Sequence, residues 1–554
     1  MTPEQLSDVF VAALTHLVSE GVVDLPDGVP SQVLVERPKV KEHGDYATNV
    51  ALQLGKRAGL NPRDLATMLA ERLTEHPGVA SVEVAGPGFL NVRVAAGAQG
   101  ALAADVVRAG ESYGTSETNA GRTINLEFIS ANPTGPLHLG HTRWAAVGDA
   151  IARVLEATGA SVTREFYIND RGAQMDKFGD SLMARAHGHE PPEDGYHGAY
   201  VTDLAERIVA HSPIVLEQPD DEQSAMFRDI GYELQLAEQK AELEELHTHF
   251  DVWFSEHSLH ESDAIQHGFA RLEEQGHLYE ADGATWMRTT DFGDDKDRVL
   301  VRSNGDLTYF ASDTAYYVNK RERGFDPCIY LLGADHHGYV GRLSAMAACV
   351  GDTPGEQLQV LIGQLVKIMQ NGEELTLSKR AGTMVTLREL IDLIGVDPLR
   401  YTLIRYPVDS PLTLDVAEMT SKSNDNPVYY VQYAHARLAS ILRNAADLGV
   451  MVDTDSFDPG QLATDREGEL LRALAEYPRV VARAAELREP HRVARYLEDT
   501  ASTFHKFYDT CRVLPQGDED TTDQHRARLV LVAATRQVLA NGLALLGVGA
   551  PDRM

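Results

Sequence analysis

Two histidines three residues apart mark the strongest candidate for a chemical site. His138 and His141 stand in the run SANPTGPLHLGH, residues 130–141, and share one face of the first turn if a helix starts there. An imidazole N–H can donate to phosphate oxygens as charge develops in phosphoryl or nucleotidyl transfer. Gly140 allows a flat adenine ring to approach the backbone. Two solvated histidines at the start of a helix would give the same sequence, so the surrounding secondary structure decides whether the pair has a chemical role.

A lysine-containing loop is the second candidate. Residues 376–383 read TLSKRAGT, and Lys379 in such a loop can pair with a polyphosphate and follow its charge as it leaves. Ser378 precedes this lysine. By itself the run SKR is typical of an ordinary solvated surface. Thr386 and Glu389 predict that a helix begins directly after the loop with a capping box.

The elements around the histidines predict a parallel sheet. Residues 123–129 alternate in the period of a strand, residues 138–158 have helical spacing, and residues 161–168 are strand-like again. Such a βαβ unit has parallel strands. Because the alternation resumes at Val299, we expect a doubly wound α/β sheet. Phosphate ligands bind such sheets at the carboxyl ends of the strands, where free helix N–H groups point outward.

Changes of pattern along the chain predict three domains. A helix over 2–20 and a hairpin over 80–94 indicate an N-terminal α/β module, and the glycine-rich run 97–121 is expected to lead out of it. A helix over 427–448 begins a helical C-terminal part. The expected domains are an N-terminal module (1–115), a Rossmann-like catalytic domain (116–395) with an acidic, mostly helical insertion (about 176–286), and a separate C-terminal helix bundle (396–554).

Charge is distributed unevenly along the chain. The 554 residues carry a net charge of −33. Residues 171–300 contain 10 basic and 29 acidic side chains, whereas residues 427–554 contain 15 and 18. The negative total argues against a nucleic-acid partner, but the nearly neutral, arginine-rich C-terminal part qualifies that argument. Composition therefore neither shows nor excludes such a partner.

The same composition excludes other classes of protein. Hydrophobic residues make up 43% and charged residues 24%, which excludes a disordered or fibrous chain. No apolar run reaches the ~20 residues of a membrane span, and the N-terminus lacks the basic region of a signal peptide. Cys328, Cys349 and Cys511 form neither a disulfide framework nor a CxxC zinc motif. We expect a cytoplasmic protein without a membrane partner.

Together the two candidate loops resemble a known family. HLGH followed more than 200 residues later by an SK-containing loop is similar to the HIGH and KMSKS motifs of class I aminoacyl-tRNA synthetases. Further matches span essentially the whole chain and resemble bacterial-type arginyl-tRNA synthetases: HGDYATNVAL, EFISANPTGPLHLGHTR, GDDKDRVLVRSNGDLTYFASDTAYY, LLGADHHGY, DPLRY, NPVYYVQYAHAR and LGVGAPDRM. One departure is that Thr376 replaces the first lysine of KMSKS and Arg380 its last residue, so Lys379 alone keeps the phosphate role.

The resemblance implies a role for each motif residue. The implied catalytic residues are His138, His141 and Lys379. The implied ATP-binding residues are Pro133, Gly135, Leu139, Gly140, Gly333, Asp335, His336 and Ser378. The implied arginine-binding residues are Glu127, Ser130, Asn132, Tyr309, Asp313 and His337.

Two of these runs also carry a physical argument. A guanidinium needs planar carboxylate acceptors, and Tyr309 and Asp313 are four apart, on one face of a helix. A lone aspartate is otherwise more often a helix cap or part of a solvated face. In GADHHGY, Asp335 can accept from ribose hydroxyls while His336 and His337 face the nucleotide or the amino acid. Adjacent residues do not easily converge on one ion, so no structural metal is expected.

Aromatic residues on the helix over 427–448 form the last candidate surface. Tyr429, Tyr433 and Arg437 lie in one row. Rings beside an arginine suit stacking on unpaired bases together with phosphate contact. Packing against a neighbouring helix explains any one tyrosine about as well. The resemblance implies a DALR-type domain that reads the anticodon.

The resemblance implies ATP-dependent ligation of L-arginine to the 3′ end of tRNA(Arg). Mg²⁺ would be carried by the ATP phosphates, and the enzyme is expected to be a monomer. Two alternatives remain open. A nucleotidyltransferase would use the same loops but would not need the C-terminal helices or a guanidinium pocket. A non-catalytic tRNA-binding paralogue would not need His138, His141 and Lys379, all of which are present.

Overall fold

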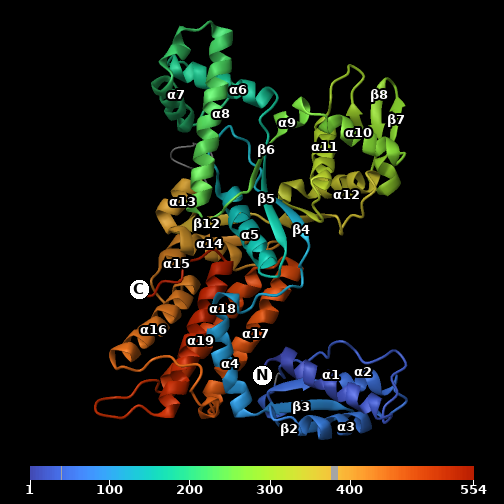
Figure 1. The fold of residues 1–554 in the computed structure, drawn as a ribbon. Coiled ribbons are helices and arrows are strands. Elements are labelled where there is room, and N and C mark those ends of the chain that lie inside the picture. The colour runs from blue at the N-terminus through green and yellow to red at the C-terminus, as the bar shows by residue number, and fades with distance from the viewer. Residues whose placement is uncertain (39, 376–384) are drawn as a thin grey trace.

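A five-stranded parallel sheet lies at the centre of the computed structural model, which describes residues 1–38, 40–375 and 385–554 (Figure 1). In order across the sheet, the strands are β11 (Leu358–Gly363), β10 (Cys328–Gly333), β4 (Thr123–Phe128), β5 (Ser161–Ile168) and β6 (Val252–Ser255). All neighbours run parallel. From β4 the chain builds outward through β5 and β6, then returns to β10 on the other side. The predicted doubly wound sheet is confirmed, and its switch point lies between β4 and β10, where such sheets bind ligands.

The predicted crossover helix is α5 (Leu139–Glu156), with His138 as its N-cap residue. Nearly every residue from Thr142 to Leu155 is buried. The sheet covers one side of α5, and the helices α14 (Val396–Ile404) and α17 (Asp465–Leu487) also pack against it. Because α5 is enclosed in this way, the residues at its N-terminus have a fixed position.

The acidic segment after β5 begins with a lobe of three helices, α6 (Ala173–Ala186), α7 (Ala199–His211) and α8 (Asp220–Glu245) (Figure 1). Beyond α8 it departs from the predicted helical insertion. β6 joins the central sheet, and α9 (Glu256–Glu261) and α10 (Ala264–Glu274) lead to an antiparallel sheet of β7 (Leu278–Ala281), β8 (Ala284–Met287) and β9 (Arg298–Val301). These strands have four residues each, too few for their alternation to stand out in the sequence.

The second half of the catalytic domain alternates as predicted. Its helices are α11 (Tyr309–Glu322), the 3-10 helix η5 (Ala334–Tyr339) and α12 (Val340–Cys349). A small sheet of β12 (Val366–Gln370), β13 (Glu373–Glu374) and β14 (Leu412–Asp415) follows, with α13 (Leu387–Ile394) and α15 (Val416–Thr420) beside α14. Thr386 caps α13, and Glu389 accepts from the backbone N–H of Thr386 (3.0 Å). The predicted capping box is confirmed.

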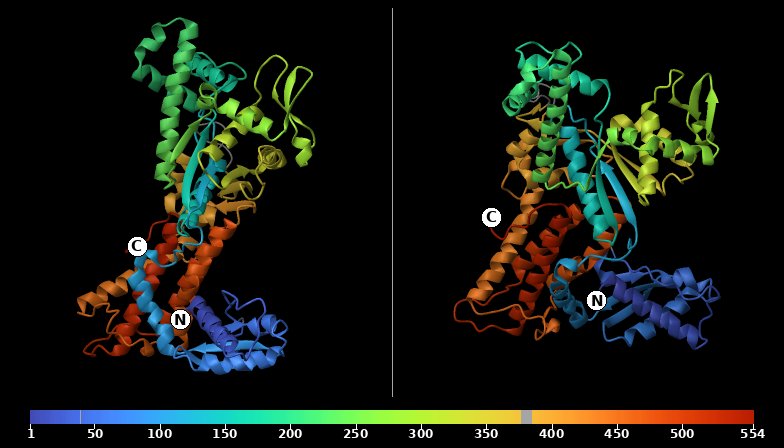
Figure 2. Two further views of the ribbon diagram at one scale, coloured as in Figure 1. Left: turned by 45° about the vertical axis from the view of Figure 1, so that its right-hand side comes forward. Right: turned by 45° about the horizontal axis from the view of Figure 1, so that its top comes forward.

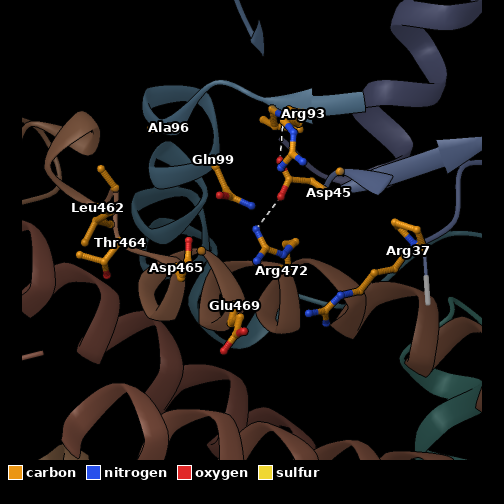
Figure 3. Close-up of a pocket in the computed structure, with 15 residues that line it drawn as sticks. Arg37, Asp45, Arg93, Ala96, Gln99, Leu462, Thr464, Asp465, Glu469 and Arg472 are labelled. Carbon is orange, nitrogen blue, oxygen red and sulfur yellow. Dashed lines mark hydrogen bonds and ion pairs between the residues drawn. The ribbon is translucent and has the colours of Figure 1, made fainter. Parts of the chain in front are cut away.

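The N-terminal domain has its own core and contains the predicted helix and hairpin. Its elements are α1 (Pro3–Ser19), β1 (Tyr46–Thr48), α2 (Val50–Gly55), α3 (Pro62–Thr74), β2 (Val79–Ala85) and β3 (Phe89–Val94), with β3 in the middle of the sheet. Figure 2 shows this domain beside the lower end of the C-terminal bundle. A polar cavity of about 310 Å³ lies at the junction, where Arg472 of α17 forms an ion pair with Asp45 (2.7 Å; Figure 3).

The C-terminal bundle consists of α16 (Pro427–Asp447), α17, α18 (His491–Thr510) and α19 (Asp523–Leu545). The glycine-rich run expected to leave the first domain instead contains α4 (Ala96–Ala109), which packs on α17 and α19. Gly100 lets α4 also approach the 3-10 helix η6 (Pro459–Gln461), because a Cβ on Gly100 would lie 2.2 Å from the carbonyl oxygen of Pro459. By length and composition alone α19 could cross a membrane, but its apolar window is 61% buried within the protein.

One hydrophobic core continues from the catalytic domain into the bundle, and its residues range along the chain from Leu102 to Val548. Arg400 of α14 is fully buried at the junction, where it forms an ion pair with Asp149 of α5 (2.6 Å) and donates to the carbonyl of Leu546. A buried charge held by several acceptors is costly to disrupt. The helical C-terminal part predicted as a separate domain therefore shares its core with the helix that carries the histidines.

Candidate active site

The chain leaves β4 through a strained turn. Ile129 and Ser130 have φ values of 70° and 47°, a region that β-branched residues above all rarely adopt. The Ser130 hydroxyl donates to Glu127 Oε1 (2.9 Å), and Oγ of Ser130 accepts from the backbone N–H of Tyr167 on β5 (3.2 Å). The loop to α5 therefore starts from a fixed point at the switch of the sheet.

His138 and His141 face each other at the N-terminus of α5. Their ring centroids are 3.7 Å apart. Nδ1 of His138 accepts from the N–H of Gly140 (3.2 Å), and Nδ1 of His141 accepts from the N–H of His138 (3.3 Å). A ring nitrogen that accepts carries no proton, so each neutral imidazole has its proton on Nε2. The backbone thus fixes two Nε2–H donors side by side.

Burial keeps both imidazoles neutral. It lowers the pKa of His138, and it lowers the pKa of His141 to about 3, with the neighbouring His138 adding to the effect. Both rings therefore donate through Nε2–H without carrying a titrating charge near neutral pH. A Cβ at Gly140 would lie 3.1 Å from Cε1 of His138, so this glycine also preserves the position of the ring.

The second motif can be described only from its far end. Lys379 and Ser378, like Thr376 and Arg380, lie outside the described residues, and their roles stay predictions. The backbone N–H of Leu139 donates to the carbonyl of Val385 (3.0 Å), and that of Leu387 donates to the carbonyl of Leu137 (2.8 Å). Two backbone hydrogen bonds thus join the segment directly after the second motif to the residues on either side of His138.

Carboxylates gather at the carboxyl ends of β4, β6 and β10. Glu256 directly follows β6, and Asp313 accepts a hydrogen bond from the hydroxyl of Tyr339 at the end of η5. Burial raises the pKa of Asp313 to about 7, and the charges of Glu256 and Glu127 add to the rise against the effect of Tyr339. Burial also raises the pKa of Glu256, which is hydrogen-bonded by Tyr167. Carboxylates that burial disfavours in this way favour a cationic ligand.

Glu127 differs because it already has a cation. Nζ of the fully buried Lys320 lies 2.5 Å from its Oε2, and Ser130 donates to its Oε1. Among the described residues, no lysine or arginine forms an ion pair with Asp313 or Glu256. The predicted arginine-binding residue Glu127 therefore already has an ion-pair partner, whereas Asp313 and Glu256 have none within 4 Å among the described residues, although the more distant charge of Arg171 partly offsets the rise in the pKa of Glu256.

Tyr309 and Asn132, both predicted to bind arginine, lie at the open side of this group. Tyr309 stands one turn before Asp313 on α11, and its side chain is 72% exposed. Asn132 is exposed and donates to Gln174 of α6 (3.0 Å). The helical face predicted for Tyr309 and Asp313 is confirmed, while their contact with a ligand stays a prediction.

Gly333 ends β10 and leads into η5. The three polar side chains that follow at this edge are exposed: Asp335, His336 and His337. Nε2 of His336 lies 3.3 Å from Oδ2 of Asp335. The remaining predicted ATP residues lie in the loop before α5 or in its first turn, with Pro133 buried, Gly135 and Leu139 half-buried and Gly140 exposed.

No group of three or more His, Cys, Asp or Glu side chains among the described residues could hold a metal ion. A divalent cation that arrives with a nucleotide takes phosphate oxygens as its main ligands. Sequence reasoning missed several residues of the site because they come from distant segments: Tyr167, Glu256, Lys320 and Tyr339. Their only common signal is a position just at or beyond the carboxyl end of a strand, or on a helix that faces it.

The row of aromatic residues on α16 is present in the structure. The rings of Tyr429 and Tyr433 stack at 6.1 Å and 10°, and Tyr433 is 37% exposed. Arg437 lies over the ring of Tyr508 on α18 (4.1 Å), and His505 of α18 lies 6.2 Å from Tyr433. Arg437 packs against a neighbouring helix and Tyr433 is partly exposed, so stacking on tRNA bases stays a prediction.

Comparison with known proteins decides the family. The chain is 57% identical over 555 aligned residues to the arginine–tRNA ligase of Kineococcus radiotolerans, and the match covers 100% of both chains. The chain belongs to the arginyl-tRNA synthetase family. Three family profiles match successive segments of this synthetase: the arginyl tRNA synthetase N-terminal domain over 4–94, the class I (R) catalytic domain over 104–396 and the DALR anticodon binding domain over 431–554.

Solved structures agree with this family. A putative arginyl tRNA synthetase of Campylobacter jejuni matches with a TM-score of 0.74 and 29% identity over 83% of this chain and 100% of that chain. The Thermus thermophilus arginyl-tRNA synthetase has the same fold, with a TM-score of 0.75 at 24% identity over 100% of both chains. The predicted resemblance and fold class are confirmed. The chain is a class I aminoacyl-tRNA synthetase, a ligase by reaction class.

Proposed function

We propose that this synthetase activates L-arginine with ATP and transfers it to the 3′ end of tRNA(Arg). The observation that carries the proposal is the combination of two partly buried groups at one edge of the sheet. A neutral histidine pair with fixed N–H donors suits phosphate, and carboxylates without an ion-pair partner among the described residues suit a guanidinium. Asp313 and Glu256 supply the acceptors for that guanidinium.

In the activation step the arginine carboxylate attacks the α-phosphate of ATP. A bond forms from the carboxylate oxygen to phosphorus, the bond to pyrophosphate breaks, and arginyl-adenylate results. Nε2–H of His138 and His141 donates to phosphate oxygens as charge builds in the pentavalent state, and because these donors are already aligned, little reorganisation is needed. Lys379 holds the leaving pyrophosphate. Mg²⁺ carried on the ATP phosphates neutralises part of their charge.

In the transfer step a hydroxyl of the terminal ribose of the tRNA attacks the carbonyl carbon of the adenylate, an ester bond to arginine forms, and the bond to phosphate breaks so that AMP leaves. We propose that Tyr429 and Tyr433 stack on unpaired anticodon bases and that Arg437 contacts phosphate. We further propose a cytoplasmic monomer, which suits its three buried free cysteines, since thiols persist in a reducing compartment. Light scattering of the purified chain tests the monomer.

ATP–pyrophosphate exchange with each of the twenty amino acids, with and without tRNA, tests the proposal. Of the twenty amino acids, we expect only arginine to support exchange, and only when tRNA is present. The reasons are that the cognate tRNA completes the site in the resembling family and that the KMSKS motif is weakened here. Robust exchange without tRNA would contradict that dependence. Exchange that needs no amino acid would indicate a nucleotidyltransferase, and no exchange under any condition would indicate a non-catalytic paralogue.

A further inference from the structure

Helices α7 and α8 of the lobe hold the loop between β4 and α5. Gln239 of α8 is fully buried, and its Nε2 donates to the carbonyl oxygens of Asn132 (3.2 Å) and Gly135 (2.8 Å). Tyr200 of α7 donates its hydroxyl to the carbonyl of Thr134 (2.9 Å). Three carbonyls of this short loop are thus turned toward the lobe.

The direction of these carbonyls matters because the loop precedes the phosphate-facing histidines. Pro133 and Pro136 follow Asn132 and Gly135, so the two peptide units that carry those carbonyls have no N–H. If either peptide unit flipped, its carbonyl oxygen would face a bound anion, and the unit has no N–H that could donate to the anion instead. In the third unit, the C=O of Thr134 and the N–H of Gly135 point in opposite directions. Holding the carbonyl therefore aims the N–H away from the lobe.

A second contact joins the lobe to the other motif. Arg388 of α13 forms a bidentate ion pair with Glu245 at the end of α8 (3.0 and 2.6 Å). α13 begins just after the second motif, and its first N–H is bonded to Leu137. One helix of the lobe thus contacts both the loop before the histidines and the segment after the second motif.

We propose that Gln239 and Tyr200 are positioning residues for ATP, which hold residues 132–135 with their carbonyls turned away from the phosphates. The proposal rests on the ATP-dependent activation proposed above. A side chain that merely fills space in the lobe would change thermal stability when it is replaced. A positioning residue would change the kinetic constants for ATP and leave those for arginine as they are.

The test compares two glutamines on the same helix. Gln239→Met keeps the length of the side chain and removes both hydrogen bonds to the loop. Gln235→Met is the matched control, because Gln235 is also buried but its Nε2 has no hydrogen-bond partner among the described residues. In pyrophosphate exchange with tRNA and arginine saturating, we expect Gln239→Met to raise the KM for ATP about tenfold or more. We expect Gln235→Met to leave it unchanged.

Two further variants keep the test decisive if Gln239→Met does not fold. Tyr200→Phe removes one oxygen and one hydrogen bond, and we expect a rise of about threefold to tenfold in the KM for ATP. Gln239→Glu places a carboxylate against two carbonyl oxygens, so its exchange rate at a fixed ATP concentration should recover as the pH falls and the protonated acid regains one donor.

Failure of this proposal is distinguishable from failure of the proposed function. If the unaltered enzyme shows no exchange with arginine, the proposed function is wrong. If it exchanges normally, but the ATP constants of Gln239→Met and Tyr200→Phe match those of Gln235→Met, the positioning role is wrong. Equal losses for ATP and arginine in both variants would also overturn it, because they indicate a general defect of the site.

Discussion

The histidine pair and the carboxylate pair are both partly buried, yet burial prepares the two pairs for different moments of the reaction. It lowers the pKa of His141 to about 3, so the imidazole is neutral before any ligand arrives, and neutral is its working state. It raises the pKa of Asp313 to about 7, so the working anion is disfavoured until a cation binds. The nucleotide side is thus ready in advance, whereas the amino-acid side is completed by its own substrate.

The largest expected effect comes from removing the charge on the amino-acid side. Asp313→Asn keeps the size of the side chain but replaces one acceptor by a donor, which leaves a guanidinium N–H unpaired. Breaking a buried charged pair costs roughly 3–5 kcal/mol, or about 10²–10³-fold or more in kcat/KM for arginine. The KM for ATP should hardly change. Steady-state constants for both substrates, after a thermal melt, provide the measurement.

Asp306→Asn is the matched control for this variant, because it makes the same chemical change on the exposed loop before α11 and should leave the arginine constants unaltered. A loss confined to ATP, or no loss at all, would remove Asp313 from the arginine pocket. Glu256 would then be the principal candidate, and Glu256→Gln would test it in the same assay.

The next effect, about 10²–10³-fold, concerns the nucleotide side. His138→Asn keeps an N-cap acceptor for the N–H of Gly140, so the start of α5 should remain intact. It removes the Nε2–H donor, and loss of one such donor typically lowers kcat by about 10²–10³-fold. Single-turnover adenylate formation measures this rate directly. An unchanged rate with an unchanged melting temperature would show that His141 alone supports the transition state.

The histidine side of the comparison was predictable from the sequence, but most of the carboxylate side was not. His138 and His141 are close in the chain, and local backbone hydrogen bonds fix their positions. The strand before them and the capping box after the second motif are also local patterns, and both were predicted. Asp313 was predicted from a helical face, but the groups that shift its pKa, Glu256 and Tyr339, come from other segments. Local periodicity contains no information about which strand ends meet.

The fold shows the same limit. The long strands β4 and β5 and the helix α5 follow their sequence patterns closely. β6, β7 and β8 were missed because four residues are too few for a period to stand out. α4 was missed because its glycines suggest a loop, although Gly100 is there to let the backbone at Pro459 come close. Tertiary contact, which a local pattern does not contain, decides such segments.

The pH dependence should differ between the two sides. Asp313 has a pKa of about 7 without a ligand, and a bound guanidinium favours its ionised form, so arginine binding must release a proton below that pH. The Kd for arginine should therefore weaken about tenfold from pH 8 to pH 6 and be nearly flat above about pH 8. The KM for ATP should not follow this curve, because His141 titrates near pH 3. Isothermal titration in buffers of different ionisation enthalpy measures the proton release.

Asp313→Asn provides the control for the pH dependence, since the variant has no carboxylate to titrate at this position. Its weaker arginine binding should be independent of pH between 6 and 8. A pH dependence that survives in the variant would assign the titration to Glu256, whose pKa burial also raises. A dependence of the same size for ATP would contradict the separation of the two sides.

The smallest expected effect tests whether tRNA binding at α16 is separate from the two sides of the active site. Arg437→Gln removes one positive charge from the row on α16. The guanidinium of Arg437 lies over the ring of Tyr508. If Arg437 contacts a tRNA phosphate, the Kd for tRNA should weaken several-fold at low salt, and the slope of log K against log[salt] should flatten by about 0.7, the value for one contact to a single strand. The constants for arginine and ATP should stay as they are, because neither buried pair is touched.

Arg443→Gln serves as the matched control for this last change. It removes the same charge from the same helix, where Arg443 donates to the carbonyl of Asp552 (3.1 Å) rather than to an aromatic ring. Filter binding over a range of salt concentrations measures both variants. If Arg437→Gln had the affinity and slope of Arg443→Gln, packing against α18 would be the whole role of Arg437, because a lost phosphate contact must change the number of released counterions.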